Sequence, residues 1–278
     1  MPRNEDRLGA KDQTGAEAPP ITEKSSILDF VLPTEFVDLP TKGRFYAEDH
    51  PLHGKESIEI RYMTAKDTDI LTSKSLLKKG VAVDRMLQNI IIDKDVKVDD
   101  LYSGDKNAIL IAARINGFGP DYKTKVTCPA CGNASDHSFN LEEVECGDFE
   151  NEASISIGGT FKIELPVTNV TVECRLLTGG DEKKMFNQSE KRKKHNLPET
   201  NLTDQYKLFI VSINGETDRG LVEKFVDLMP ARDATHLKSI YEKASPNVDL
   251  SHDYSCESCD ADTQINIPFS ANFFWPNA

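Results

Sequence analysis

Cys128-Pro129-Ala130-Cys131 and Cys256-Glu257-Ser258-Cys259 are two Cys-x-x-Cys turns that lie 128 residues apart (256 minus 128) in a chain of 278 residues. Two residues between the cysteines allow one tight turn to direct both sulfur atoms at the same ion, and a tetrahedral Zn²⁺ binds two such turns. The sequence therefore predicts one structural zinc, with Cys128, Cys131, Cys256 and Cys259 as its ligands. A shared ion would connect two distant segments and so decide how the chain is arranged.

The same four cysteines also admit a disulfide or a redox-active dithiol. A reactive thiolate needs a positive group beside it, and the residues before the turns, Val126-Thr127 and Tyr254-Ser255, supply none. Cys146 and Cys174 stay unpaired in the zinc scheme. Cys174 falls in a predicted strand, where we expect a small core residue.

The composition excludes some classes of protein. Hydrophobic residues make up 38% of the chain and charged residues 28%, which allows a core and a solvated surface. The net charge of −13 argues against a nucleic-acid-binding protein. The longest apolar run, Ile109–Ala113, is far shorter than the roughly 18–20 residues that cross a bilayer. The polar start Met1–Asp6 predicts no signal peptide, and a reducing compartment favours metal over disulfide.

The sequence indicates an internal repeat. One copy opens with Ile58–Thr64 followed by Asp67, and the other with Val172–Thr178 followed by Asp181, at an offset of 114 residues (181 minus 67). Both openings alternate like strands, and the threonine at the end of each is a predicted helix N-cap.

The later parts of the two copies match at an offset of 128 residues, which aligns Asp105 with Asp233 and the two cysteine turns with each other. The larger offset predicts an insertion in the second copy. We place it at Gln188–Thr200, and we interpret the charged run Glu190–His195 within it as a solvated loop.

These patterns predict an α+β fold of two tandem pseudo-repeats, each a strand, helices, a cysteine knuckle and a strand, joined by one shared four-cysteine, zinc-ribbon-like site. The expected organisation is a flexible arm (1–26), an irregular strand-and-turn segment packed on the body (27–57), a first repeat (58–145), a connecting β-hairpin (146–171), and a second repeat with an aromatic tail (172–278). The alternation of Ile155–Leu165 around Gly158-Gly159 is the signal for the hairpin.

Histidines and the end of the chain are further candidate site residues. His50 and His53 flank Pro51 and predict a loop, whereas His137 and His252 lie near the cysteines as candidate neighbours of the metal ligands. The end of the chain, Ile267–Pro276, carries four aromatic residues and should be buried on its own body or on a partner. No phosphate loop, catalytic triad or carboxylate pair is recognisable, so no enzyme is predicted.

Five stretches of the chain resemble the T4-type bacteriophage baseplate hub subunit and assembly family. They are Leu39–Tyr46, His50–Lys55, Ile58–Asp67, Asp69–Leu71 and Phe273–Pro276. The resemblance covers most of the chain from about residue 27 onward. It implies a non-enzymatic protein of contractile-tail phages that builds the central baseplate hub and contacts other hub proteins or the tape-measure protein.

The first hypothesis is therefore a structural or assembly protein of a phage baseplate, present in the virion tail and in the host cytoplasm during assembly. It would have no membrane partner and no nucleic-acid partner. The alternative is a zinc-ribbon adaptor that binds nucleic acid or a polymerase-type complex, and the acidic composition argues against it. A thiol–disulfide enzyme is a third hypothesis.

Overall fold

The computed structural model describes residues 32–147, 155–195, 198, 200–269 and 273–274. The chain divides into two units, Met1–Leu32 and Pro33–Ala278, and every element below belongs to the second. The fold is mixed α and β, as the sequence predicts. The proposed arm at 1–26 and the first residues of the segment 27–57, up to residue 31, lie outside the described residues.

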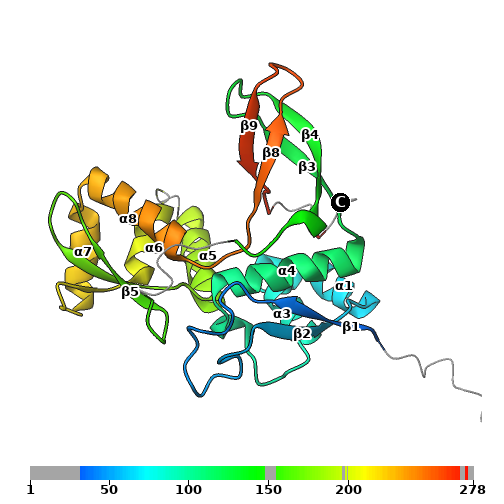
Figure 1. The fold of residues 1–278 in the computed structure, drawn as a ribbon, viewed down its shortest axis with the longest axis horizontal. Helices are drawn as coiled ribbons and strands as arrows, with labels where there is room; N and C mark the ends of the chain where they lie inside the picture. Colours follow the sequence, from blue (N-terminus) through cyan, green and yellow to red (C-terminus); the bar gives the residue numbers. More distant parts are fainter. Residues whose placement is uncertain (1–31, 148–154, 196–197, 199, 270–272, 275–278) are drawn as a thin grey trace, which may run out of the picture. The chain divides into compact units, whose positions relative to one another are not determined.

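The first set of elements is a hairpin followed by helices (Figure 1). Its members are β1 (Thr34–Asp38), β2 (Ser57–Arg61), α1 (Ala65–Thr72), α2 (Lys74–Lys78), α3 (Ala82–Ile90), the 3-10 turn η1 (Val98–Asp100) and α4 (Ser103–Phe118). β1 and β2 pair antiparallel, with Phe36 opposite Glu59. The turn-rich segment between them is fixed by buried Leu39, Phe45 and Leu52.

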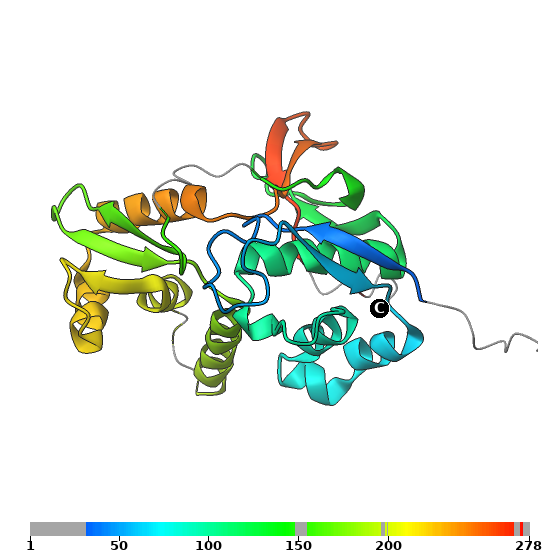
Figure 2. The same ribbon diagram turned by 60° about the horizontal axis from the view of Figure 1, so that its bottom comes forward.

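The second set begins with a three-stranded antiparallel sheet in the order β5-β6-β7 (Figure 2). Its members are β5 (Thr160–Glu164), β6 (Thr171–Arg175), α5 (Gly179–Lys194), α6 (Asn201–Phe209), β7 (Ile210–Ile213), α7 (Arg219–Leu228) and α8 (Ala231–Ala244). Two further hairpins complete the fold: β3 (Asp121–Thr127) with β4 (Ala134–Asn140), which leads into the 3-10 turn η2 (Leu141–Glu143), and β8 (Ser251–Ser255) with β9 (Asp262–Asn266).

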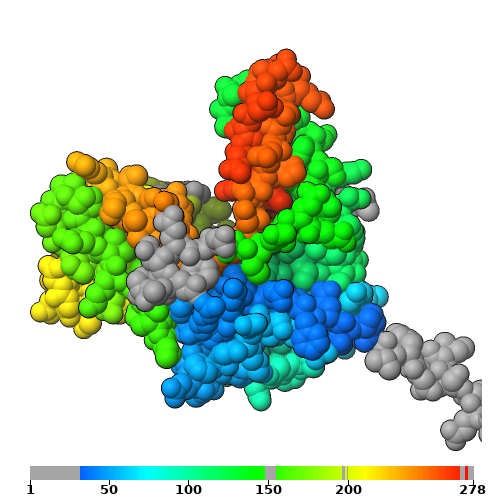
Figure 3. Space-filling model, viewed as in Figure 1, coloured from blue at the N-terminus to red at the C-terminus, as the bar shows by residue number. Residues whose placement is uncertain are grey.

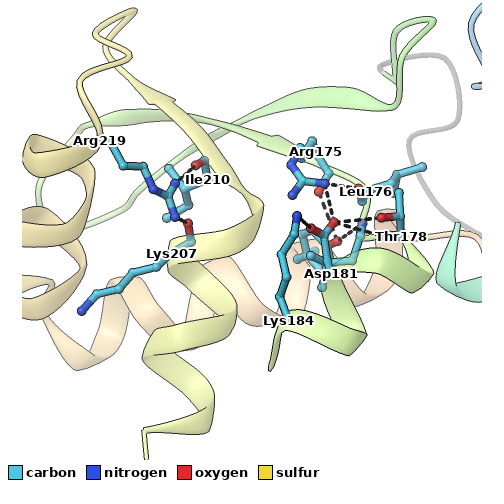
Figure 4. A network of polar contacts seen from close by, with 10 residues as sticks. Arg175, Leu176, Thr178, Asp181, Lys184, Lys207, Ile210 and Arg219 are labelled. Carbon is cyan, nitrogen blue, oxygen red and sulfur yellow. Dashed lines mark hydrogen bonds and ion pairs between the residues drawn. The ribbon is translucent and has the colours of Figure 1, made fainter. Parts of the chain in front are cut away.

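Helices α1 and α5 start with the same set of contacts. Before α5, the N–H and the hydroxyl of Thr178 donate to Asp181, and Arg175 binds the same carboxylate at 2.6 Å (Figure 4). Before α1, Thr64 donates to Asp67 in the same way, and Arg61 binds Asp67 at 2.7 Å. Both predicted N-caps are confirmed. The carboxylate also lies at the positive end of each helix dipole.

A guanidinium also joins the elements that follow α5. Arg219, at the start of α7, donates to the carbonyls of Lys207 in α6 and Ile210 in β7 (Figure 4). α6 passes directly into β7 without an intervening turn, and these bonds satisfy carbonyl groups at that junction. They therefore stabilise the change of direction between the helix and the strand.

Buried aspartates stabilise the starts of α4 and α8. Asp105 accepts hydrogen bonds from the N–H and the hydroxyl of Thr41 at 3.0 and 2.6 Å. Asp233 accepts from the N–H and the hydroxyl of Thr168 at 3.1 and 2.8 Å. Each bond set ties a helix start to the preceding hairpin segment.

Short backbone contacts join the two sets of elements. The N–H of Ser103 donates to the carbonyl of Leu177, and the N–H of Gly179 donates to the carbonyl of Leu101. Nearby, the ammonium of Lys106 binds Asp84 at 2.8 Å and Glu182 at 2.9 Å. The start of α4 and the start of α5 are therefore held together directly.

Two expectations need correction. The run Glu190–Lys194 is not a loop: it forms the last turns of α5, with His195 as the C-cap. Its residues are good helix formers, and cations are favoured at a helix C-terminus. The hairpin does not turn at Gly158-Gly159, because β5 begins after those residues and pairs with β6, with Phe161 opposite Cys174. Ser156 and Thr160 only close a local turn there.

Phe273 and Phe274 of the aromatic tail are buried on the chain's own body, whereas Phe269 is exposed. Phe273 contacts Tyr122 with ring centroids 5.1 Å apart, and Phe274 contacts Phe118 at 6.3 Å. Trp275 lies outside the described residues. Within the described ranges, no helix is both long and apolar enough to cross a bilayer.

Candidate metal centre

The first cysteine turn forms the tip of the β3–β4 hairpin. The N–H of Cys128 donates to the carbonyl of Asn133, and the N–H of Gly132 donates to the carbonyl of Cys128, each at 2.9 Å. Gly132 has a φ of 72°, a left-handed conformation that glycine adopts without strain. This conformation lets the chain reverse directly after Cys131.

The second turn repeats this geometry at the tip of β8–β9. The N–H of Cys256 donates to the carbonyl of Ala261 at 3.1 Å, and the N–H of Asp260 donates to the carbonyl of Cys256 at 2.9 Å. Asp260 occupies the left-handed position with a φ of 51°. Aspartate is among the few residues other than glycine that tolerate this conformation, so the turn survives without a glycine.

The four cysteine sulfurs come together from the two hairpin tips. All lie within 4.8 Å of one another, and two separations between the turns are 3.9 Å, from Cys128 to Cys259, and 3.8 Å, from Cys131 to Cys256. A tetrahedral ion with bonds of about 2.3 Å requires sulfurs roughly 3.8 Å apart. The four sulfurs therefore fit a tetrahedral metal ion that binds four thiolates, such as Zn²⁺.

The four cysteines do not form disulfide bonds in this arrangement. All four cysteines are free, and a disulfide needs sulfurs about 2.05 Å apart. Sulfurs of different turns lie as close as 3.8 Å, so the four thiols form one cluster and not two separate dithiol pairs.

The backbone around the second turn favours a thiolate. The N–H of Ser258 points at the sulfur of Cys256, and this hydrogen bond is the main reason why the pKa of Cys256 falls to about 6. The N–H of Ala261 has the same effect on Cys259, but contacts from the thiols of Cys131 and Cys256 outweigh it and raise the pKa of Cys259 to about 12. A bound cation would stabilise the cysteines of the cluster as thiolates.

The two hairpins that carry the cysteines also contact each other at the tips and below them, where they lie side by side (Figures 1 and 3). Asn133 donates to the hydroxyl of Ser258 at 2.6 Å, and the hydroxyls of Ser135 and Tyr254 lie 2.9 Å apart. These polar contacts set the distance between the tips independently of any ion.

His137 and His252 form the next contact along this interface, with their Nε2 atoms 3.3 Å apart. Burial lowers the pKa of His137, and the adjacent His252 lowers it further. The sequence placed each histidine near a cysteine turn but did not indicate that they meet. The strand registers bring them together, because His137 lies on β4 and His252 on β8.

The remaining candidate residues lie elsewhere. His50 stacks on Tyr46 with centroids 4.3 Å apart, and His53 bonds the carbonyl of Tyr46, which confirms a loop role for both. Cys174 is buried on β6, as expected of a small core residue, and Cys146 is exposed. A four-thiolate site is coordinatively closed and leaves no position for a substrate.

One comparison with known proteins decides the family. The sequence model of the T4 bacteriophage base plate protein family matches residues 36–275, which include both cysteine turns. The chain belongs to this family. Comparisons with curated proteins and with solved structures gave no match. For this member of the base plate family, the cysteine cluster therefore lies within the region that defines the family.

Proposed function

We propose that this chain is a non-enzymatic structural or assembly protein of the central hub in a contractile-tail phage baseplate. The observation that carries the proposal is the family match over residues 36–275. The partners would be other hub or tail proteins, among them the tape-measure protein. The chain would act in the host cytoplasm during assembly and in the tail of the virion.

The proposed cofactor is one Zn²⁺ bound by Cys128, Cys131, Cys256 and Cys259. The sulfur separations and the matched backbone turns support it. The ion would lock the β3–β4 and β8–β9 hairpins into one rigid projection. Its part in the function would be structural, since all of its coordination positions are filled by the chain.

We also propose that the described body is a pair of tandem pseudo-repeats, 58–145 and 172–278. The boundaries 27–57 and 146–171 mark the segments before and between them. The support is that Arg61, Thr64 and Asp67 make the same contacts as Arg175, Thr178 and Asp181. The two positive-φ residues that follow the cysteine turns, Gly132 and Asp260, also match.

Two measurements test these proposals on the full chain. Elemental analysis should find about one zinc per chain. Two ions per chain would contradict the shared site, and an oxidised, metal-free protein would favour the thiol–disulfide hypothesis. Affinity purification of the tagged chain from phage-infected cells should recover tail proteins. Recovery of RNA or polymerase subunits without tail proteins would instead support the zinc-ribbon adaptor.

A further inference from the structure

A groove of about 610 Å³ crosses α4 between β1 and the segment that contains η2. Its floor is apolar and comprises Ala108, Ile111, Ala112 and Ile115 of α4 together with Val37, Leu141, Val144 and Val248. Figure 3 shows β1 in blue and the Leu141–Cys146 segment in green on opposite sides of α4. The groove is separate from the cysteine cluster, because none of the four sulfur ligands lines it.

The rim of this groove is acidic. Glu35, Asp38, Glu142 and Glu145 line it, and no lysine or arginine is among the described residues of its lining. Glu142 and Glu145 are exposed on the η2 side, whereas Glu35 accepts a hydrogen bond from Asn116. An apolar floor between carboxylates is complementary to a segment that combines apolar and basic side chains.

One wall of the groove is an open strand edge. Among the described strands, β1 pairs with β2 alone. The carbonyl of Pro33 accepts from Tyr62 and the N–H of Leu39 donates to Glu56, so the odd-numbered residues of β1 face β2. In an antiparallel ladder the alternate residues face away. Phe36 therefore presents its N–H and C=O on the groove side, at the centre of β1.

The groove is closed at one end. The sulfur of Cys146 lies 3.9 Å from the carbonyl of Asp38, so the last outward carbonyl of β1 is covered there. The side chain of Phe36 is 70% exposed, which adds apolar surface beside the open edge. An extended segment could therefore pair with the centre of β1 and would have to end near Asp38.

We propose that this groove binds a short extended segment of a partner protein, apolar in its centre and flanked by lysine or arginine, which adds a strand to β1. Main-chain bonds to Phe36 would supply affinity, and the acidic rim would select basic flanks. The expectation that this partner is a tail protein rests on the proposed function. The predicted chemistry of the segment, apolar with basic flanks, rests on the groove alone and not on the proposed function.

A photo-crosslinking amino acid in place of Ala112 tests the groove directly. The control carries the same amino acid in place of Leu228, which lies on α7 outside the groove and is 83% exposed. The full chain is expressed in infected cells and irradiated, and the crosslinked peptide is sequenced by mass spectrometry. We expect one partner segment at Ala112 with basic residues on both sides of apolar ones. An acidic segment, a second copy of this chain, or no product above the Leu228 control would overturn the proposal.

A synthetic copy of the crosslinked segment then serves as the probe for binding by fluorescence anisotropy. Phe36→Pro removes the outward N–H and leaves the bonds to β2 intact, whereas Phe36→Ala removes the ring and keeps the N–H. We expect Phe36→Pro to weaken binding about fivefold or more, as the loss of one hydrogen bond predicts, and clearly more than Phe36→Ala. Equal losses in both variants would overturn the main-chain contact.

The acidic rim has its own matched pair of variants. Glu142→Lys with Glu145→Lys should weaken binding of the peptide by about tenfold at low salt and by less at high salt. Glu48→Lys with Glu216→Lys makes the same change of net charge at exposed positions away from the groove and should leave binding unchanged. Equal effects of the two pairs would refute the role of the rim.

The groove and the proposed function can fail separately. A basic–apolar segment captured from a protein outside the tail would support the groove and contradict the hub assignment. Tail proteins that co-purify with the chain but give no crosslink at Ala112 would support the assignment and overturn the groove.

Discussion

The sulfur atoms of Cys128 and Cys259 lie 3.9 Å apart although 131 residues separate them in the chain. Each sits at the tip of a two-stranded hairpin, and an isolated two-stranded hairpin is only marginally stable. An ion bound by both tips would therefore stabilise each hairpin through the other. This relationship leads to the first prediction.

Replacement of Cys259 by serine should abolish zinc binding and lower the thermal unfolding temperature. Metal binding in such a site contributes folding free energy, so its loss should destabilise the two hairpins most. Elemental analysis and calorimetry measure the two effects. Cys146→Ser is the matched control, because Cys146 is free and exposed and lies outside the cluster. A variant at Cys259 that keeps its zinc would contradict the ligand assignment.

The stability of the protein should fall as the pH drops below about 4. Burial opposes the charge of Asp67, but hydrogen bonds from Arg61, Thr64 and Asn89 outweigh it and hold the pKa of this carboxyl far below its usual range. Such a group stabilises the fold above the unfolded-state pKa of about 3.9, and this stabilisation is lost as the pH falls toward the native pKa. Asp181 behaves in the same way beside Arg175.

Asp67→Asn should therefore cost about 3–5 kcal/mol at neutral pH, because it leaves the charge of Arg61 without its partner. It should also flatten the decline of stability at acid pH. Denaturant unfolding between pH 7 and pH 2 measures both effects. Asp69→Asn changes an exposed residue of the same helix and should shift neither quantity by more than about 0.5 kcal/mol. An unchanged acid slope in Asp67→Asn would contradict the role of this ion pair.

Tyr46→Phe should destabilise the protein by about 1–3 kcal/mol. The hydroxyl of Tyr46 donates to Asp105 at 2.7 Å and accepts from the N–H of Tyr102 at 3.1 Å, so its removal leaves two buried groups with one partner fewer. Tyr206→Phe removes a hydroxyl that makes one bond, to the carbonyl of Ala234, and should cost less. Chemical unfolding of both variants compares them. A larger loss of unfolding free energy in Tyr206→Phe than in Tyr46→Phe would contradict the prediction that the hydrogen bonds around Asp105 contribute more.

Gly179→Ala should destabilise the junction between η1 and the start of α5 by about 1–3 kcal/mol. A Cβ at this position would lie 2.5 Å from the carbonyl oxygen of Val98, which is backbone and cannot swing away. Gly220→Ala, in α7, would meet only the side chain of Asp218 at 3.3 Å, and it should be neutral or stabilise by up to about 1 kcal/mol. Thermal unfolding of the pair measures the difference. Equal effects would mean that η1 and the start of α5 do not approach each other so closely.

Local patterns predicted local structure well. Thr64 and Thr178 were recognisable as N-caps because an aspartate follows each after two residues, and the bonds form within one helical turn. The burial of Cys174 followed from its position in a predicted strand and from the usual burial of free cysteine. The prediction of a loop at Glu190–Lys194 was wrong, because the composition of this charged run suits both a solvated loop and an exposed helix end. The helix forms because these residues have high helix propensity and cations suit its C-terminus.

Contacts between distant segments were harder to foresee. Alternation indicated that Thr160–Glu164 forms a strand but not that its partner is β6, since periodicity does not choose between neighbours. The meeting of His137 and His252 depends on two strand registers and on the packing of one hairpin against another. The open edge of β1 and the acidic groove have no signature in the sequence, because their lining residues come from four separate segments.

The sequence by itself determined the two Cys-x-x-Cys turns, the capped helix starts and the acidic character of the chain, because each depends on neighbouring residues or on composition. Only the tertiary structure decided that the tips of β3–β4 and β8–β9 meet with their sulfurs at tetrahedral spacing. The physical reason is that this distance is set by the packing of both hairpins, through contacts such as Ser135 with Tyr254. A spacing of two residues within one turn fixes where the two sulfurs of that turn point. Only the fold brings the two sulfurs of the other turn next to them.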